Sequence, residues 1–513
     1  MGRVANTPLA SPAVDTVIVD GGPLSPAQVA SVALGTASAV AGAGLAERLA
    51  PARRVVDEAV ESESVVYGIT TGFGALATTH IGKSETEALQ YNLLRSHATG
   101  VGKPVSDEVV RAMLLLRART LAQGHSGVRP VIVEKLLEML ERDILPVVPS
   151  QGSVGASGDL APFAHLALPL IGEGLVRVDG EVIAASESRL EPIQLLTKEG
   201  LSLLNGTEGM SAMGAIALHH ARNLTAAADV AAALTVEALL GSARPFRPEI
   251  HALRPHPGQV ASAARIADLI EASQIIASHS DDFVHAVQDA YSLRCAPQVH
   301  GAVTDTLDHM ERVLTVEMGS VVDNPIVFAE KGEVISGGNF HGEPLAFVFD
   351  FATIATSELA SISERRTDRI LDPSRSQGLP PFLASNPGVE SGYMITQYVQ
   401  AALVAENRVL AHPASVDTVP TSAGQEDHVS MGWGAARKLL TVIENVRRVL
   451  AIEILCAVQA IEFRAPLTPA SGTGRVVNAV RERVPTLNGD RSHSGDIDTV
   501  AAMIENGEIA AVI

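Results

Sequence analysis

The stretch Thr225-Ala-Ala-Ala-Asp-Val-Ala-Ala-Ala233 lies within a helical pattern that runs from just after Asn205-Gly206 to about Leu240. A helix of this length spans roughly 50 Å at about 1.5 Å per residue, which is too long for one small domain. The stretch is apolar on several faces, and helices of this kind are normally buried. We therefore expect a bundle of long helices, in which bundles from several subunits pack together.

Similar long helical patterns recur along the rest of the chain, at Gly301–Met318, Glu343–Arg369, Gly392–Leu410 and Asp427–Glu462. Apolar residues make up 46% of the sequence but aromatic residues only 3%, so small aliphatic side chains must fill the core, and these suit packed helices better than a β-sandwich. The predicted fold is mainly α. It comprises a flexible tail at 1–15, a smaller α-rich N-terminal region at 16–203 that carries functional loops, and an elongated long-helix bundle at 204–513.

The chain is acidic, with a formal net charge of −20 over 513 residues. This charge argues against nucleic acid and membrane surfaces as partners, because both are bound through clustered Lys and Arg. The two cysteines, Cys295 and Cys456, are too few for a disulfide framework. The amino terminus lacks the apolar core of a signal peptide, and no run reaches the roughly 18 uninterrupted apolar residues of a membrane span. We expect a cytoplasmic protein.

An irregular segment, Leu145–Gly158, interrupts the N-terminal helices with two prolines and three glycines. Loops of this length inside compact folds are usually functional or disordered. The segment leads into Gly152–Leu160, which has Ala156-Ser157-Gly158 at its centre. Taken alone, the tripeptide favours a plain turn or a helix N-cap. The spacing excludes a nucleophile elbow, which needs Gly two places before and after the serine, and a phosphate loop, which needs a following Lys.

Other polar and glycine-rich interruptions fall at the ends of helical patterns, and each has an ordinary structural explanation. Asn205-Gly206 is a common turn dipeptide, Arg294 could be a surface charge, and Gln425–His428 could be a solvated first helical turn. The sequence holds no His-Glu-x-x-His or Cys-x-x-Cys pattern and no dinucleotide fingerprint, so we predict no metal site.

Taken together, eight of these motifs resemble the aromatic amino acid ammonia-lyases, and within that family the histidine ammonia-lyases most closely. They occur in order from Tyr67 to Met431, so the resemblance covers nearly the whole chain. The motifs are Tyr-Gly-Ile-Thr-Thr-Gly-Phe-Gly (67–74), Ser-His-Ala-Thr-Gly (96–100), Gly-Ala-Ser-Gly-Asp-Leu-Ala-Pro (155–162), Leu-Leu-Asn-Gly-Thr (203–207), Gln-Asp-Ala-Tyr-Ser-Leu-Arg (288–294), Asp-Asn-Pro (323–325), Gly-Gly-Asn-Phe-His (337–341) and Gln-Glu-Asp-His-Val-Ser-Met (425–431).

The resemblance implies that Ala156, Ser157 and Gly158 cyclise and lose water to form 4-methylidene-imidazol-5-one (MIO), with no external cofactor. Such an electrophile is needed because deamination removes a barely acidic β-hydrogen and expels a poor leaving group, chemistry that ordinary side chains do not supply. The resemblance also implies a homotetramer whose active sites are each assembled from three subunits.

Further roles follow from the matched motifs. Tyr67 matches the base that takes the β-proton, and Arg294 matches the guanidinium that holds the substrate carboxylate, a task that suits its bidentate fork. The remaining matched positions line the MIO group and the amino acid, shape the pocket or assist cyclisation. These are Asn205, Gln288 and Tyr291 for lining, Phe340 for the pocket and Asp159 for cyclisation.

Two positions indicate the substrate. His97 and Glu426 match residues that surround an imidazole ring, and a carboxylate can accept a hydrogen bond from the ring N–H. Phenylalanine and tyrosine lyases that resemble this chain usually carry Asn-Gln-Asp where it reads Gln425-Glu426-Asp427, because a buried Glu beside a phenyl ring has no partner. Three departures from the bacterial histidine lyases concern the substrate and leave the reaction class intact: Thr70, Ala290 and Gly342.

The sequence therefore predicts a lyase that converts L-histidine to trans-urocanate and ammonia. A tyrosine or phenylalanine ammonia-lyase or aminomutase of the same family is the alternative. A non-catalytic helical scaffold or binding protein is the alternative from a different class, and the intact Ala156-Ser157-Gly158 with Tyr67 and Arg294 argues against it.

Overall fold

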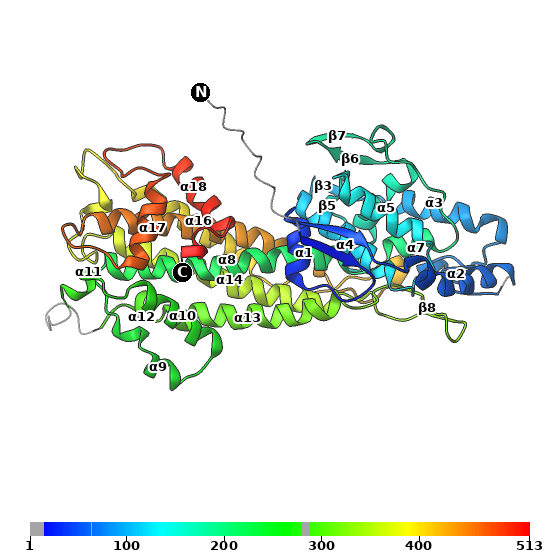
Figure 1. Ribbon diagram of the computed structural model, residues 1–513, viewed down its shortest axis with the longest axis horizontal. Coiled ribbons are helices and arrows are strands. Elements are labelled where there is room, and N and C mark those ends of the chain that lie inside the picture. The colour runs from blue at the N-terminus through cyan, green and yellow to red at the C-terminus, as the bar shows by residue number, and fades with distance from the viewer. Residues whose placement is uncertain (1–14, 63, 280–287, 513) are drawn as a thin grey trace, which may run out of the picture. The chain divides into compact units, whose positions relative to one another are not determined.

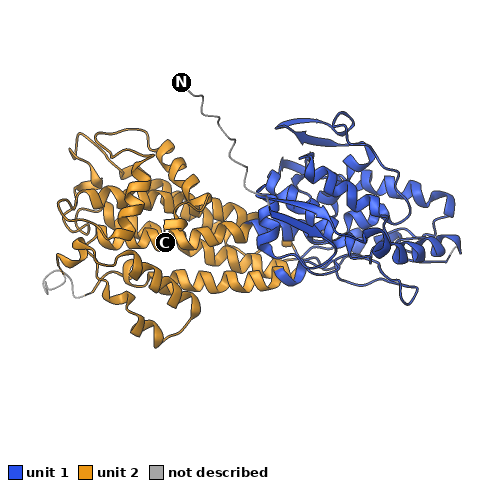
Figure 2. Cartoon of the chain, in the orientation of Figure 1, with its two compact units in different colours: residues 1–216, 315–342, 418–430 blue, residues 217–314, 343–417, 431–513 orange. Residues whose placement is uncertain are grey.

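The structure, a computed structural model, describes residues 15–62, 64–279 and 288–512. It is mostly helical, which confirms the predicted mainly α class (Figure 1). The chain forms two compact units (Figure 2). Unit 1 comprises residues 1–216, 315–342 and 418–430, and unit 2 comprises residues 217–314, 343–417 and 431–513.

The units are interleaved in sequence, because two later segments, 315–342 and 418–430, belong to unit 1. The sequence patterns suggested continuous ranges, 16–203 and 204–513, and that division stays a prediction. The predicted tail at 1–15 lies outside the described residues except for Asp15, which begins a strand.

Among its described residues, unit 1 is built from seven α-helices, the first turns of an eighth and the last residues of a ninth. The seven are α1 (Pro26–Ala33), α2 (Leu45–Glu61), α3 (Thr86–His97), α4 (Asp107–Ala122), α5 (Pro130–Glu141), α6 (Leu160–Ala167) and α7 (Glu199–Leu204). Helix α4 is the core element: it packs against α1 and α5 and is buried from Ala112 to Ala122. Two arginines inside this run, Arg117 and Arg119, are 0% and 1% exposed.

In the described part of the chain, short strands accompany these helices in four small sheets. Strands β1 (Asp15–Val19) and β2 (Ala37–Ala41) are parallel, whereas β3 (Val101–Pro104) pairs with β5 (Pro149–Gln151) in antiparallel fashion. The other pairings are also antiparallel and involve β4 (Leu145–Pro146), β6 (Leu175–Val178), β7 (Glu181–Ala184), β8 (Ile326–Phe328) and β9 (Glu333–Ile335). The segment predicted to be irregular, Leu145–Gly158, thus begins with two strands of two and three residues, which are too short to give a sequence period.

Unit 2 is a bundle of long helices, as predicted. Its described helices are α8 (Glu208–Ala238, which begins in unit 1), α9 (Pro248–Ala252), α10 (Pro257–Leu269), α11 (Gln274–Ala277), α12 (Tyr291–Arg294), α13 (Ala296–Glu317, which ends in unit 1), α14 (Glu343–Leu371), α15 (Met394–Leu410), α16 (Gly432–Glu462), α17 (Ser471–Arg481) and α18 (Ser494–Glu505). The helix predicted from Asp427 begins five residues later, at Gly432. The cause is Met431, which precedes the helix in the left-handed conformation, φ 59°.

Helices α14 and α16 form the centre of unit 2 and share a buried ion pair, with Arg366 Nη2 2.8 Å from Glu453 Oε2. A buried pair of this kind is costly to break from one side, because the remaining charge loses its partner. Among the described residues, α14 is also the one helix long and apolar enough to cross a membrane by length and composition. It is mostly buried against α15 and α16, which is the arrangement of a core helix.

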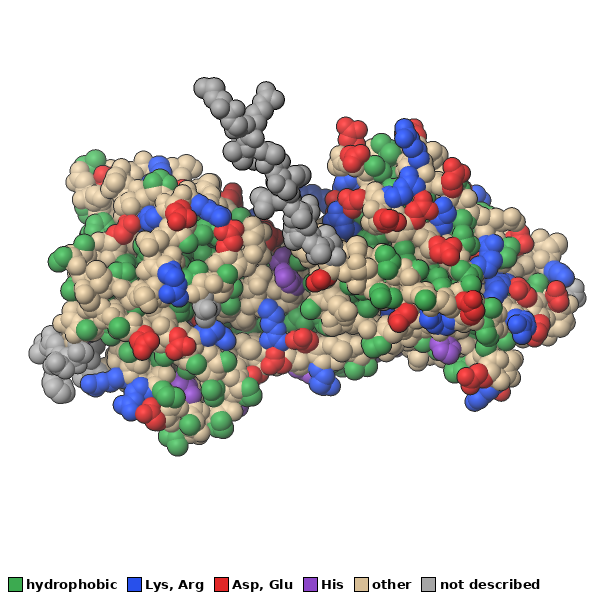
Figure 3. All heavy atoms as spheres, in the orientation of Figure 1, with side chains coloured by type: hydrophobic (Ala, Val, Ile, Leu, Met, Phe, Trp, Pro, Cys, Tyr) green, Lys and Arg blue, Asp and Glu red, His purple; other side chains and the backbone are tan. Residues whose placement is uncertain are grey.

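The Ala-rich middle of α8 is almost wholly buried within the single chain. The predicted burial of this stretch is therefore confirmed, and its apolar faces no longer need other subunits to cover them. On the face drawn in Figure 3, Lys and Arg side chains are interspersed with Asp and Glu over both units.

Candidate active site

The segment Gly155–Asp159 adopts an unusual backbone. Gly155, Ser157 and Gly158 have φ angles of 78°, 52° and 77°, and a serine at positive φ is strained, whereas glycine is not. The carbonyl oxygen of Gly206 lies so close that a Cβ added to Gly158 would be 2.0 Å from it. Only glycine fits at position 158, and the tripeptide is pressed against the turn that joins α7 to α8.

Asp159 anchors this segment from inside. Its backbone N–H donates to Gly206 O at 2.9 Å, while its carboxylate accepts from Met210 N at 2.8 Å and from Ser153 Oγ at 3.0 Å. The side chain is fully buried, and this burial raises the pKa of the Asp159 carboxyl to about 7. The predicted assistant of cyclisation is thus a carboxyl that can hold or release a proton near neutral pH.

Asn205 lies on the turn against which the tripeptide packs. It is 5% exposed, and its Nδ2 donates to Asn324 O at 3.4 Å. Its buried Oδ1 has no hydrogen-bond partner among the described residues. A buried acceptor without a partner is costly, which makes it a candidate for binding a donor from a ligand.

Glu426 approaches the same tripeptide. Its Oε1 lies 3.4 Å from Ser157 Oγ, and its Oε2 accepts from Thr421 Oγ1 at 2.7 Å. The backbones of Thr421 and Glu426 also pair, closing a turn in which Ser422 and Ala423 have φ of 49° and 52°. This strained turn fixes the carboxylate beside the serine.

His97 ends α3, and its half-buried ring interacts electrostatically with Glu426. Its Nδ1 lies 2.9 Å from Leu93 O, a contact that requires the proton on Nδ1 and leaves Nε2 as an acceptor. Burial is the main influence and lowers the pKa of His97, against the smaller opposing effects of Leu93 and Glu426. The ring is therefore neutral at neutral pH.

The predicted base, Tyr67, is half-buried at the start of a glycine-rich loop. Its hydroxyl accepts from Gly74 N at 3.5 Å, and its ring meets Phe73 edge-on at 6.5 Å. Thr70, one of the departures, is buried and stabilises the base of the loop by donating to Ser64 O and accepting from Val66 N. Ser422 holds the tip of the loop, because its Oγ accepts from Ala75 N at 3.1 Å.

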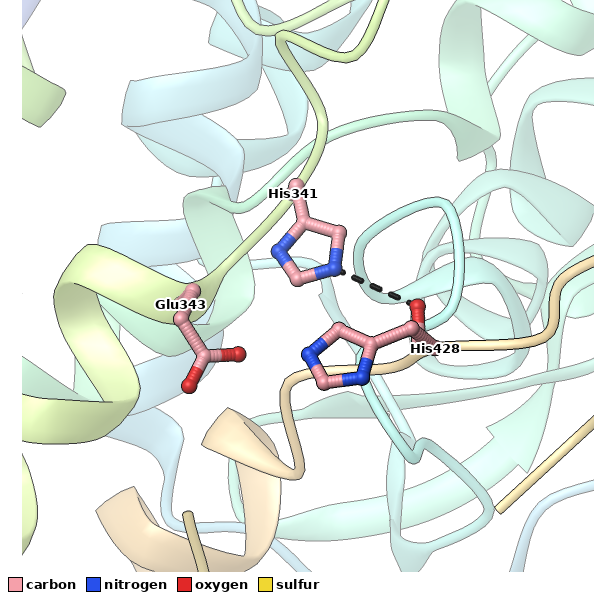
Figure 4. A group of neighbouring side chains, drawn as sticks. All are labelled: His341, Glu343 and His428. Atoms are coloured by element: carbon pink, nitrogen blue, oxygen red, sulfur yellow. Dashed lines mark hydrogen bonds between the residues drawn. The ribbon is translucent and has the colours of Figure 1, made fainter. Parts of the chain in front are cut away.

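Phe340 is half-buried in the turn after β9. The next residue, His341, stacks on His428 with ring centroids 5.8 Å apart, and its Nε2 lies 3.3 Å from His428 O (Figure 4). Glu343, also drawn there, is the first residue of α14 and belongs to unit 2. This ring stack joins the segment 315–342 to the segment that carries Glu426.

The other three predicted site residues belong to unit 2. Gln288 and Tyr291 are exposed, and Tyr291 retains 71% of its accessible surface. The Arg294 guanidinium stacks over the Tyr291 ring at 4.5 Å, and its Nε donates to Asp289 O at 2.9 Å. Unit 1 thus brings Ser157, Asp159, Asn205, His97 and Glu426 together, while unit 2 carries the predicted carboxylate clamp.

Several residues that shape this site were missed in the sequence. Ser153, Thr421 and Ser422 act through their hydroxyl groups, and hydroxyl residues are too common in the sequence to signal such contacts. Arg117 and Glu208 bracket the 205–207 turn, as their shared ion pair shows. Gly155 and Gly158, which flank Ala156-Ser157, are the local sequence signal of a close backbone approach.

Comparison with known proteins places this geometry in a family. The sequence profile for aromatic amino acid lyases matches residues 24–482. A histidine ammonia-lyase of Gloeobacter violaceus is 51% identical over 511 residues, covering 97% of this chain and 98% of that protein. One from Deinococcus radiodurans is 53% identical over 470 residues, covering 91% and 89%.

Solved structures agree with this assignment. A tyrosine aminomutase from Streptomyces globisporus has a TM-score of 0.92 at 38% identity, covering 97% of this chain and 98% of that one. A histidine ammonia-lyase from Trypanosoma cruzi has a TM-score of 0.89 at 42% identity, covering 97% and 94%. The predicted carbon–nitrogen lyase class is confirmed, and the chain belongs to the aromatic amino acid lyase family.

Proposed function

We propose that this enzyme eliminates ammonia from L-histidine to give trans-urocanate, with an MIO group formed from Ala156-Ser157-Gly158. The observation that carries the proposal is the 3.4 Å approach of Glu426 Oε1 to Ser157 Oγ. A carboxylate suited to an imidazole N–H thus lies beside the serine whose Cβ would become the electrophilic carbon. The histidine ammonia-lyases at about half identity over nearly the whole chain support the same substrate.

The residues around the tripeptide fit an MIO group. The backbone of Gly158 lies against Gly206 with no room for a side chain, and the buried, unpartnered Oδ1 of Asn205 offers an acceptor next to it. Ala156, Ser157 and Gly158 would form the group, with Asp159 and Phe340 around it. Once formed, it supplies an electrophilic methylidene carbon that makes the substrate amine a better leaving group.

The chain's own side chains would then bind and orient the amino acid. Arg294 holds the carboxylate, with Gln288 and Tyr291 next to it, and its stacking on the Tyr291 ring orients the guanidinium. His97 and Glu426 hold the imidazole, Glu426 accepting a ring N–H and neutral His97 offering Nε2. Tyr67 removes the β-proton from a loop that the glycines allow to close over the substrate.

A single assay separates the candidate substrates. The purified protein is incubated separately with histidine, tyrosine and phenylalanine, and the ultraviolet absorbance of the conjugated acid products is followed. We expect product from histidine. Product from tyrosine or phenylalanine alone would mean that this amino acid, and not histidine, is the substrate. No product from any of the three would favour a non-catalytic protein.

Glu426→Gln tests the basis of the choice. Losing one charge-assisted hydrogen bond to the imidazole costs about 1.5–3 kcal/mol, so kcat/KM for histidine should fall about 10-fold to 100-fold. Glu330→Gln removes one negative charge from an exposed position of the same unit and should leave kcat/KM unchanged. Equal activity of the two variants would contradict imidazole recognition by Glu426.

We also propose that the enzyme is a cytoplasmic homotetramer whose active sites are shared between subunits. Exposed apolar side chains on α14 and α15 support assembly, since exposed apolar surface marks interaction sites. They are Phe347, Phe351 and Ile354 on α14 and Ile395 and Tyr398 on α15, which are 44–61% exposed. The free state of Cys295 and Cys456 suits the cytoplasm.

Complementation tests the sharing of sites. Ser157→Ala and Arg294→Ala should each be inactive alone. Co-expressed chains that mix at random should regain roughly one functional site in four if Ser157 and Arg294 come from different subunits. No recovery in verified mixed oligomers would mean that one chain supplies both residues.

A further inference from the structure

The turn that presses on the tripeptide is held by a buried arginine. Arg117 on α4 is 0% exposed and donates from Nη1 to Ser202 O and to Asn205 O, both at 2.7 Å. Its Nη2 pairs with the Glu208 carboxylate. One guanidinium thus caps the end of α7, holds the turn and pairs with the first residue of α8.

Gly206 at the centre of the turn is enclosed by the same groups. It has φ of 151°, and a Cβ added to it would lie 2.2 Å from Glu208 Oε2, 2.3 Å from Arg117 Nη2 and 2.7 Å from Val322 O. The peptide therefore cannot move away from Gly158 without disturbing the ion pair. On its other side, the Gly206 carbonyl accepts the Asp159 N–H and blocks the space at Gly158.

Joining two helices through this ion pair costs free energy, because both charges lose their contact with water. Burial raises the pKa of Glu208, and Arg117 is the main opposing influence. One carboxylate oxygen of Glu208 and Nε of Arg117 have no hydrogen-bond partner among the described residues. Buried ion pairs are weak contributors to stability, and apolar residues of similar volume often serve as well. A role in fixing the geometry of the turn accounts for the pair better than stability does.

We propose that Arg117 is a positioning residue for the self-modification of the tripeptide. This inference rests on the proposed function, because it requires that the tripeptide cyclises. In that reaction the Gly158 nitrogen bonds to the Ala156 carbonyl carbon, and the Ala156 oxygen leaves as water with the hydrogens of the Gly158 and Ser157 amides. Ser157 Oγ leaves with its own hydrogen and the Ser157 Cα hydrogen as a second water. Arg117 touches none of these atoms and acts through the Gly206 peptide.

The test follows maturation by mass. Wild type and variants are made by cell-free translation, and the fraction of chains that have lost two waters is measured over time by mass spectrometry. Arg117→Lys keeps the charge but loses the fork. We expect its dehydration to be slower by at least about tenfold, because a misplacement of about 1 Å costs reacting groups on the order of 100-fold.

Arg119→Lys is the matched control. Arg119 lies two residues along α4, is equally buried, and donates to the Gly22, Gly319 and Ser320 carbonyls rather than to the 205–207 turn. It should disturb the core to a similar degree and still mature at the wild-type rate. Equal maturation of the two folded variants, whether fast or slow, would overturn the positioning role.

Two further measurements keep the proposal testable. In a Ser157→Ala background, where dehydration cannot occur, Arg117→Lys should speed hydrogen exchange of the Asp159 amide at least about tenfold, and Arg119→Lys should not. If Arg117→Lys does not fold, the milder Glu208→Gln replaces it and should also delay dehydration. A wild type that never loses two waters would refute the proposed function itself, whereas a mature wild type with an equally mature Arg117→Lys would refute only the positioning role.

Discussion

The buried Asp159 carboxyl should make the free energy of unfolding depend on pH in a specific way. The pKa of Asp159 in the folded state, about 7, lies above the ordinary value of 3.8. Between pH 3.8 and about pH 7, the folded state therefore keeps a proton that the unfolded state has released. The stability that this proton contributes is fully present below about pH 4 and is lost as the pH rises to about 7. At about 1.36 kcal/mol for each pH unit, the total is about 4 kcal/mol, of which about 3 kcal/mol falls between pH 5 and pH 8.

The Asp159→Asn variant isolates this effect, because Asn resembles the protonated acid and does not titrate. Both proteins should carry Ser157→Ala, so that the tripeptide stays unmodified in each. Thermal unfolding from pH 5 to pH 8 should show Asp159→Asn gaining on its parent as the pH rises, with no further gain well above pH 7. The charged groups that act on the Asp159 pKa, Glu208 and Arg117, are present in both proteins. A constant difference, or one that grows toward acid pH, would refute the buried, proton-holding carboxyl.

Three other predictions concern the site. Ser157→Ala should abolish turnover and leave the circular dichroism and melting temperature unchanged; an active variant would exclude MIO. If Tyr67 is the base, Tyr67→Phe should lower kcat by about 100-fold or more, because a positioned general base contributes about 100-fold to 10,000-fold; an unchanged kcat would indicate another base. Ser422→Ala removes the acceptor of the Ala75 N–H, a bond worth about 1 kcal/mol, so kcat should fall up to about fivefold and proteases should cut the Tyr67 loop faster; unchanged kcat and cleavage would show that Ser422 does not hold the loop.

The helices could be predicted from the sequence because they are long and their caps are local. Ser25 caps α1 with a capping box, and α8 extends over nearly the whole predicted range. The start of α16 was wrong because the left-handed Met431 is set by its surroundings rather than by its own propensity. The strands were largely missed because most have only two to four residues, fewer than a period-2 pattern requires.

The site residues could be predicted only as a set of motifs, because the contacts that make them a site join distant segments. Ser157 and Glu426 are 269 residues apart, and Ala75 and Ser422 are 347 apart. Arg117 and Arg119 show the limit most clearly. The two arginines lie on one buried helix with the same local sequence character, and only the backbone carbonyls that each one reaches distinguish them.

The choice between a plain turn and a reactive segment at Ala156-Ser157-Gly158 therefore depends on a second glycine, Gly206, 48 positions after Gly158. A Cβ at Gly158 would collide with the carbonyl of Gly206, and a Cβ at Gly206 would collide with the pair that holds that carbonyl in place. Gly158 is required because of the Gly206 carbonyl, and Gly206 is required because of the ion pair behind it. A plain surface turn has no such requirement. A turn that needs only a positive φ tolerates Asn or Asp at modest cost, whereas these two positions exclude every side chain. These two close approaches, more than the tripeptide itself, support the proposed cyclisation over a plain turn.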